Sequence, residues 1–300
     1  MAGRNRTIVT VDASHEGSRL DKVVQSVVPD VGLREARRMI REGLVRVDGL
    51  PGAKGDRMRQ GQQLEIREPL TGRSPETFTI VTVQAGLAAL EKPAGVHSQS
   101  LGRTRDLGVD ASLAALFPGQ DPVLLNRLDK DTSGLLIAAL TREAETTWHV
   151  SQNKGEIEKF YLTLVRGRLA EPVAIKNQIN SAHRSKVKVL EENNPDKRRW
   201  TLVYPFPMAS EPDRTLCLVR ILKGGRHQIR AHMASCGHPV VGDPLYGTRA
   251  EGGLRLHHFH VRLPGFEAMC WPGWIDSSSE EKREPIATTV RDLNWETTFG

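Results

Sequence analysis

Cysteine is scarce in this sequence, and long hydrophobic runs are absent. The 300 residues include three cysteines, which are widely separated and show no Cys-x-x-Cys spacing. This pattern indicates neither a disulfide framework nor a cysteine metal site, so we expect Cys217, Cys236 and Cys270 to be buried, unreactive thiols. No segment approaches a membrane span, and MAGRNRTIVTV at the start lacks the apolar stretch of a secretory signal. We therefore expect a cytoplasmic protein with no membrane partner.

The composition is that of a folded protein with a basic surface. Hydrophobic residues make up 38% of the chain, enough for the core of one large domain or of two smaller ones. The formal net charge of +6 indicates a polyanionic partner. Many proteins that never bind nucleic acid are also basic, so the motifs have to decide.

The first seventy-odd residues have the features of a separate unit. Apolar residues recur at helical spacing from Leu33 to Ile40, and the other face of this predicted helix carries Arg34, Arg37, Arg38 and Arg41. We expect Gly43 to end the helix. The turn signal Asp48-Gly49 and the alternation over 63–68 predict short strands or a hairpin. A charged helix face is also typical of a plain solvated surface, so this pattern alone leaves its role open.

A second domain of mixed α and β structure is predicted beyond a linker. Residues 69–77, PLTGRSPET, are typical of a linker. From Ile80 onward most apolar runs are strand-like, and a helix is predicted over 142–152 behind a Thr141 N-cap. The charged tail from Asp276 predicts no more than a loosely attached helix near 288–296.

Two densely charged stretches need an explanation. LLNRLDKDTSGLL at 124–136 places four charges between apolar runs, namely Arg127, Asp129, Lys130 and Asp131. A polar turn directed at water would also account for it.

The second stretch is LKGGRHQIRAHMASCGHPVVGDPLYG at 222–247. A helix that starts near His227 would place Arg230 one turn later, and Gly237 could end it in the left-handed conformation. An arginine at that place could reach a carboxylate.

The histidines and glycines do not predict a metal or nucleotide site. HHFH contributes His257, His258 and His260, which form neither an i,i+4 helical pair nor an obvious set of three convergent ligands. GGRHQIR lacks the Gly-Lys-Ser/Thr ending of a phosphate loop.

Several motifs, in the same order along the chain, resemble those of the RluA-like (large-subunit-type) pseudouridine synthases. They are EKPAGVHSQS at 91–100, RLDKDTSGLL at 127–136, KFYLTLVRG at 159–167 and HQIRAHMASCGHPVVGDPLYG at 227–247. The segments RLDKVVQ at 19–25 and LREARRMIREGLVRVDG at 33–49 resemble the S4 RNA-binding domain that often precedes this catalytic domain. The resemblance covers the chain to about residue 270.

The resemblance implies an α+β protein with two domains. We expect an S4-like RNA-binding domain followed by a mixed, mainly antiparallel-sheet catalytic domain. The expected boundaries are 1–70 for the S4-like domain, 71–78 for a linker, 79–275 for the catalytic domain and 276–300 for a tail of unclear structure.

The resemblance also implies a reaction, in which uracil leaves C1′ of a uridine in RNA, rotates and rejoins through C5. Asp129 matches the family's catalytic aspartate, and a carboxylate can attack C1′ or stabilise positive charge there. Arg230 matches the arginine that pairs with this aspartate, holding it ionised and oriented. Tyr161 matches the active-site tyrosine, whose ring supports uracil and whose hydroxyl lies near the proton lost from C5.

RNA contacts follow from the same resemblance. Arg127 occupies the position of an arginine that fills the space left by the flipped base. Further contacts are expected from the helix arginines Arg34, Arg37, Arg38 and Arg41 and from His227 and Gln228. The implied partner is structured RNA, with ribosomal RNA favoured over transfer RNA. The protein is expected to act as a monomer, and no cofactor or metal is implied.

Two positions depart from the family pattern. Asn126 stands where many relatives have histidine, and GGRHQIR is one residue shorter than Gly-Arg-x-His-Gln-Ile-Arg, which leaves the placement of Arg226 ambiguous.

The alternatives to a pseudouridine synthase that acts on ribosomal RNA are the same chemistry on transfer RNA, a non-catalytic RNA-binding or assembly protein, and a metal hydrolase that uses the histidines.

Overall fold

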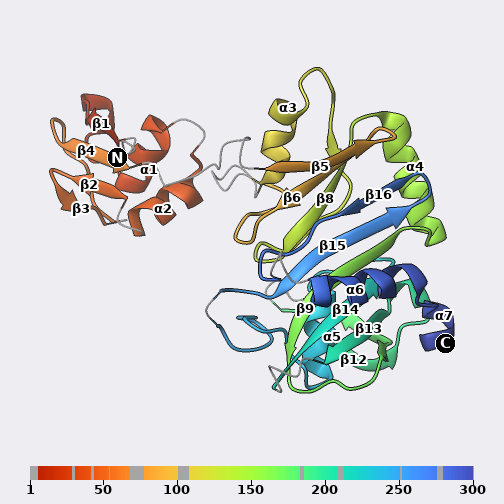
Figure 1. Ribbon diagram of the computed structural model, residues 1–300. Helices are drawn as coiled ribbons and strands as arrows, with labels where there is room; N and C mark the ends of the chain where they lie inside the picture. Colours follow the sequence, from red (N-terminus) through yellow and green to blue (C-terminus); the bar gives the residue numbers. More distant parts are fainter. Residues whose placement is uncertain are drawn as a thin grey trace. The chain divides into compact units, whose positions relative to one another are not determined.

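The computed structural model divides into two compact units (Figure 1). One comprises Met1–Ser74 with Gln99–Ser112, and the other comprises Pro75–Ser98 with Leu113–Gly300. The residues that the structure describes are 6–28, 31–41, 44–53, 55–67, 78–100, 108–182, 186–207, 213–250, 252–275 and 280–299. Most of the expected linker lies outside these ranges.

The first unit combines two helices with a four-stranded antiparallel sheet of order β1-β4-β2-β3. Its strands are β1 (Arg6–Thr10), β2 (Val45–Val47), β3 (Leu50–Pro51) and β4 (Gln63–Arg67). Its helices are α1 (Leu20–Val27) and α2 (Leu33–Arg41), and its 3₁₀ turns are η1 (Ala13–His15) and η3 (Val109–Ser112).

Local sequence signals account for much of this unit. The predicted helix from Leu33 is α2, and its apolar residues Ala36, Met39 and Ile40 are all buried. Gly43, expected to end that helix, lies outside the described residues. The Asp48-Gly49 turn joins β2 to β3 with positive φ at both residues, 48° and 81°, which confirms the predicted hairpin.

The second unit is built on one large sheet of order β10-β13-β14-β9-β15-β8-β6-β5. The pair β15–β8 is parallel, and the other pairs along this order are antiparallel. This confirms the expected mixed, mainly antiparallel sheet. Figure 1 shows β8, β15 and β9 side by side in its middle. The strands on this path are β5 (Thr79–Gln84), β6 (Leu87–Lys92), β8 (Ser133–Ala139), β9 (Glu158–Arg166), β10 (Val173–Ile175), β13 (Thr201–Pro207), β14 (Arg214–Ile221) and β15 (Leu256–Leu263).

Shorter elements complete the unit. β7 (Val123–Leu124) pairs with β8, β16 (Phe266–Met269) pairs with β15, and β11 (Asn177–Asn180) pairs with β12 (Lys188–Asn193). The helical elements are α3 (Leu113–Leu116), α4 (Arg142–Lys154), η4 (Lys197–Arg199), α5 (Gln228–Ser235), α6 (Glu280–Asp292) and α7 (Trp295–Phe299).

Two predicted helices of this unit form, and α4 extends to Lys154, two residues beyond its predicted end. Thr141 caps α4 by accepting a hydrogen bond from the N–H of Ala144, and Gly155 ends the helix with φ 79°. His227 precedes the first residue of α5, and Gly237 follows its end with φ 82°. Arg230 therefore lies in the first turn of α5.

The C-terminal tail is more firmly attached than the sequence indicated. It forms α6 and α7 rather than one loose helix near 288–296. Ile286, Val290, Trp295 and Phe299 are buried in a cluster that includes Phe160 on β9. The tail thus covers apolar side chains of the sheet. Its charged sequence did not predict this packing.

The thiols differ in exposure. Cys217 is buried and Cys270 is half-buried, but Cys236 is exposed, so the expectation of a buried thiol was wrong there. Cys236 directly follows the last residue of α5, where the chain turns at Gly237. No helix within the described ranges is both long and apolar enough to cross a membrane.

Candidate active site

Asp129 lies on the loop between β7 and β8, whose backbone is held by buried polar side chains. The hydroxyl of Ser98 donates to the carbonyl of Leu128 and accepts from the N–H of the same residue, both at 2.8 Å. The fully buried ammonium of Lys92 donates to the carbonyl of Lys130 at 3.0 Å. The residues on both sides of Asp129 are therefore anchored, which restricts where its carboxylate can lie.

A single buried arginine joins two aspartates. Arg230 donates from Nη1 to Oδ2 of Asp129 at 2.9 Å, and from Nε and Nη2 to the two carboxylate oxygens of Asp243 at 2.7 and 2.8 Å. The bidentate pair fixes the plane of the guanidinium. The exposed fraction of the side chain is 4% for Arg230, 0% for Asp243 and 23% for Asp129. Only Asp129 among the three is open to a substrate.

The charges of this cluster do not cancel. Burial alone would raise the pKa of Asp243. The hydrogen bonds and charge of Arg230, together with the backbone N–H groups of Leu245 and Tyr246, outweigh burial and hold that pKa below its ordinary value. Burial also opposes the charge of Arg230, yet its two aspartate partners raise its pKa. Two carboxylates share one guanidinium, so the cluster carries a net charge of −1 when both are ionised.

Tyr161, on β9, lies against His258 on the neighbouring strand β15. The two rings are stacked, with centroids 4.5 Å apart and planes inclined by 17°. Burial raises the pKa of Tyr161 above its ordinary value, and the negative charge of Asp129 raises it further. The phenol is therefore protonated near neutral pH.

His227 is brought next to Asp129 by an unusual backbone conformation. Its φ of 52° lies in the left-handed region, which is uncommon for a residue other than glycine. Nε2 of His227 lies 3.9 Å from Oδ2 of Asp129, and Nδ1 lies 3.1 Å from the hydroxyl of Tyr246. That hydroxyl accepts from the N–H of Val187 at 2.8 Å. Burial lowers the pKa of His227.

Gln228 is a buried neighbour of the cluster. Its Oε1 accepts from the N–H of Gly225 at 2.8 Å, and its Nε2 donates to the carbonyl of Arg199 at 2.8 Å and to the hydroxyl of Thr201 at 3.0 Å. These bonds hold the start of α5 against the start of β13. The expected RNA contact of Gln228 stays a prediction.

The residues around the two motif departures have clear positions. Asn126 replaces the common histidine, and its side chain bridges to β8 by donating to the carbonyl of Leu135 at 3.2 Å and accepting from the N–H of Ile137 at 2.7 Å. Arg226 is exposed, and its Nη2 donates to the carbonyl of Ser181 at 3.2 Å. Arg127 is exposed, where RNA can reach it.

The arginines predicted on α2 lie in the first unit, and only one of their side chains can be described. Arg37 is 41% exposed, and its Nε donates to the buried carboxylate of Asp21 at 2.8 Å. Arg34, Arg38 and Arg41 belong to α2, but their side chains lie outside the described residues. Their RNA contacts stay predictions.

The histidines of HHFH have structural hydrogen bonds. Nδ1 of His257 lies 2.8 Å from the hydroxyl of Ser133, and Nε2 of His260 lies 2.6 Å from a carboxylate oxygen of Glu267. Nδ1 of His258 lies 2.6 Å from the carbonyl of Leu135. Within the described part of the chain, no three His, Cys, Asp or Glu side chains form a group that could hold a metal ion.

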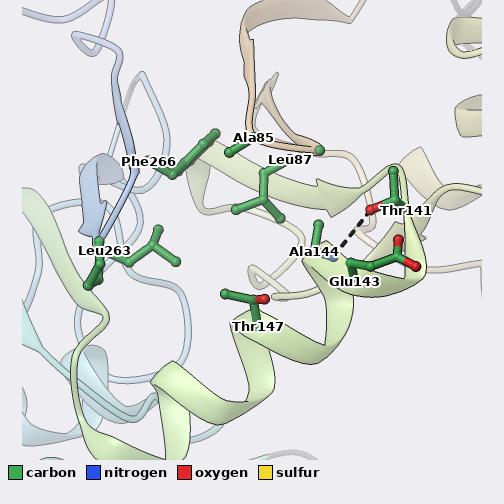
Figure 2. A pocket seen from close by; sticks show the side chains of 10 residues that line it. Ala85, Leu87, Thr141, Glu143, Ala144, Thr147, Leu263 and Phe266 are labelled. Carbon is green, nitrogen blue, oxygen red and sulfur yellow. Dashed lines mark hydrogen bonds between the residues drawn. The ribbon is translucent and has the colours of Figure 1, made fainter.

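A small apolar pocket lies elsewhere on the second unit (Figure 2). Its volume is about 330 Å³, and its walls come from the β5–β6 turn, the first turns of α4 and the β15–β16 turn, including Leu87, Ala144 and Phe266. Neither Asp129 nor Tyr161 lines it. The pocket is therefore separate from the charged cluster.

Sequence reasoning missed several residues of the site. No role was predicted for Lys92, Ser98, Asp243 or Tyr246, although all four lie in the motifs that carry the resemblance. For His258, only the role of a metal ligand was weighed. The sequence signal for Asp243 was its place in GDPLYG, a polar residue between turn-forming residues after an apolar run.

Comparisons with known proteins show the family to which the chain belongs. A family model described as RNA pseudouridylate synthase matches residues 86–235. An uncharacterized RNA pseudouridine synthase of Chloroflexus aurantiacus is 31% identical over 95% of this chain and 91% of its own length. Ribosomal large subunit pseudouridine synthase C of Vibrio vulnificus is 29% identical over 95% of this chain and 96% of its own length.

The fold agrees as well. The structure of Human RNA Pseudouridylate Synthase Domain Containing 1 superposes with a TM-score of 0.58 at 24% identity, covering 75% of this chain and 98% of that one. Its likeness concerns the fold. The family match spans half of the chain, and the Chloroflexus relative spans nearly all of it. The chain therefore belongs to the RNA pseudouridylate synthase family, whose members are isomerases that act on RNA.

Proposed function

We propose that the protein converts uridine to pseudouridine in large-subunit ribosomal RNA, with Asp129 as the group that acts at C1′. The choice of RNA is supported by relatives named ribosomal large subunit pseudouridine synthase C, among them the Escherichia coli protein at 30% identity over 81% of this chain. Ribosomal RNA would also place the protein in the cytoplasm, where we expect it to act as a monomer.

The observation that supports the role of Asp129 is that one of its two carboxylate oxygens accepts a hydrogen bond and the other is open. Oδ2 accepts from Arg230, whereas Oδ1 receives no hydrogen bond within the described part of the chain. An oriented carboxylate with one open oxygen suits attack on an electron-poor carbon. Because Asp243 takes two of the donors of Arg230, Asp129 shares the guanidinium and keeps negative charge for C1′.

The atoms of the isomerisation balance without a further reactant. Asp129 attacks C1′, or stabilises its positive charge, as the C1′–N1 bond breaks and the electron pair stays on N1 of uracil. After rotation C5 bonds to C1′ and the carboxylate is released. C5 then loses its proton, and N1 gains one.

Tyr161 is the proposed partner for the proton at C5. Its pKa is raised by burial and also by the charge of Asp129. That charge is absent only while Asp129 is bonded to C1′, and it returns before C5 loses its proton. The phenol is therefore still protonated at that step, and it can take the proton of C5 only as it gives its own proton to N1.

RNA binding would involve both units. We propose that Arg127 fills the space left by the flipped uridine, since it is exposed and two residues from Asp129. We also propose that residues 1–70 act as an S4-like RNA-binding module. Supporting this, α2 carries four arginines, and Arg37 is partly exposed.

The test is to compare pseudouridines in ribosomal and transfer RNA from cells with and without the gene. A uridine of large-subunit ribosomal RNA should lose its modification, and purified protein should restore it in the isolated RNA. Loss confined to transfer RNA would replace the proposed substrate with the runner-up. Loss in neither RNA would refute the proposed substrate.

A further inference from the structure

His258 contacts Tyr161 across two neighbouring strands. In the antiparallel register of β9 and β15, Tyr161 stands opposite His258, and the near-parallel stack at 4.5 Å puts the imidazole directly against the phenol ring. Both residues are buried. Offset stacking at this distance gives an attraction beyond area burial and restricts the tilt of both rings.

The hydrogen bonds of His258 define its protonation state. The carbonyl of Leu135 can only accept, so the contact of 2.6 Å requires a proton on Nδ1 of His258. Nε2 then carries a lone pair, and it is buried without a partner within the described residues. The pKa of His258 is lowered to about 3, chiefly by burial. The hydrogen bond to Leu135 raises it, and the charges of Lys159, His257 and His260 contribute to lowering it. Tyr161 therefore stacks on a neutral ring.

The same carbonyl links His258 to the loop of Asp129. Leu135 accepts from His258 and also from Nδ2 of Asn126, which lies three residues before Asp129. Gly134 lets the backbone of β8 lie close to that of His258, because a Cβ at position 134 would lie 2.3 Å from the backbone oxygen of His258. The stack and the loop thus share one backbone atom on β8.

We propose that His258 is a positioning residue for the reaction, which holds the ring of Tyr161 in a fixed plane and ties that plane to the backbone before Asp129. The inference rests on the proposed role of Tyr161. A buried nitrogen without a partner in the described residues also occurs at His260, so what distinguishes His258 is its stack on Tyr161 and its bond to the carbonyl that Asn126 also uses. Its ring and its Nδ1 donor are what the site uses.

Two substitutions separate the parts of His258. His258→Asn keeps a donor near the place of Nδ1 and loses the ring, whereas His258→Phe keeps the ring and loses the donor. His260→Asn is the matched control, since His260 lies on the same strand, is fully buried, stacks on Phe160 at 5.4 Å and has an unpartnered Nδ1. Its loss should affect folding in a similar way but should leave Tyr161 in place.

A direct readout is available from NMR of the protein with ¹³C-labelled tyrosine, because the chain has three tyrosines. The signal of Tyr161 is the one absent from Tyr161→Phe. In His258→Asn it should move toward the position of an unstacked tyrosine and show faster ring flipping. It should stay shifted in His258→Phe and be unchanged in His260→Asn. An unmoved Tyr161 signal in His258→Asn would overturn the proposal.

Kinetics on uridine-containing RNA give the functional readout. We expect kcat to fall roughly ten- to a hundredfold in His258→Asn, because small misplacement of a reacting group is costly, with KM unchanged. His258→Phe should recover most of the loss. An equal loss in His260→Asn, or a change in KM alone, would reduce His258 to a structural residue.

Tyr161→Phe distinguishes this proposal from the proposed function. A fall in turnover of roughly ten- to ten-thousandfold supports a role for the hydroxyl in proton transfer. Normal turnover would remove that role, while the NMR result still decides whether His258 positions the ring. Inactive Tyr161→Phe beside fully active His258→Asn would refute the role of His258 alone.

Discussion

Each unit contains a cluster of arginine and aspartate, and the two clusters have opposite composition. In the first unit, the carboxylate of Asp21 accepts from Nε of Arg37 at 2.8 Å and from Nε and Nη2 of Arg19 at 3.1 and 2.7 Å. Its side chain is 0% exposed, whereas those of Arg19 and Arg37 are 38% and 41% exposed. In the second unit the buried central residue is Arg230, and the outer, partly exposed residue is Asp129.

The difference lies in the charge that each cluster presents to its surroundings. Two arginines around one aspartate leave a net charge of +1, which attracts RNA phosphates. Two aspartates around one arginine leave −1, which suits chemistry at an electron-poor sugar carbon. Under the proposed function, the same ion-pair chemistry would serve RNA binding in one unit and reaction in the other, depending on which partner is buried.

Removing the negative charge at Asp129 should have the largest effect. Asp129→Asn is nearly isosteric, so folding and RNA binding should persist, but a neutral amide can neither attack C1′ nor stabilise positive charge there. Pseudouridine formation in ribosomal RNA from a strain lacking the gene should fall below detection. The control is Asp131→Asn, two residues away, which should keep substantial activity. Normal turnover by Asp129→Asn would disprove the mechanism, and loss only in Asp131→Asn would identify the other carboxylate.

Removing the central residue of each cluster compares their contributions to folding. Arg230→Met leaves Asp243 buried without its partner, which should lower the free energy of unfolding by about 3–5 kcal/mol. All five tryptophans belong to the second unit, so urea unfolding followed by tryptophan fluorescence reports that unit. Asp21→Asn should lower the free energy of unfolding by less, because Arg19 and Arg37 can turn to water. The unfolding of this variant is followed by circular dichroism of the helices. A larger loss for Asp21→Asn would reverse the comparison.

Acid should destabilise the second unit first. The pKa values of His232 and His257 are lowered to about 4 and that of His258 to about 3, in each case chiefly by burial. Below pH 6.5 these histidines bind protons in the unfolded chain but stay neutral in the folded chain. The free energy of unfolding therefore decreases as the pH is lowered, by roughly 1.4 kcal/mol per pH unit for each histidine.

The first unit should resist acid further. Burial would raise the pKa of Asp21, but its two arginines lower it, so their stabilisation is present above pH 3.8 and is lost only below it. Tryptophan fluorescence during urea unfolding at pH 7 and pH 5 measures the effect on the second unit. In His258→Asn, the pH dependence of the free energy of unfolding should correspond to about one fewer proton. Equal stability at the two pH values would contradict the buried neutral histidines.

The smallest expected effect concerns the salt dependence of RNA affinity. Arg37→Gln should reduce the slope of log affinity against log salt by about 0.9, if Arg37 contacts one phosphate. Adding Arg38→Gln and Arg41→Gln should flatten the slope further. Asp21→Asn is the control, since it removes a negative charge and should not reduce the slope. An unchanged slope in the triple variant would exclude α2 from the RNA interface.

Much of the local structure could be predicted because it depends on neighbouring residues. Helical spacing predicted α2, a threonine cap predicted the start of α4, and Asp48-Gly49 predicted the hairpin turn. The C-terminal helices were harder, because their attachment depends on a few apolar residues such as Trp295 that pack on distant strands. Exposed Cys236 was missed because burial depends on where α5 ends in the fold.

The amino-acid order by itself determined the motifs and the two charged stretches, and the expectation that Asp129 and Arg230 act together came from the resemblance that these motifs carry. Only the tertiary structure decided how they meet, since the hydrogen bond joins residues 101 positions apart. It also decided that Asp243 holds two donors of Arg230, and that His258 lies against Tyr161. The physical reason is that spacing encodes local periodicity, whereas these contacts depend on strand register and on which charges the closed fold buries.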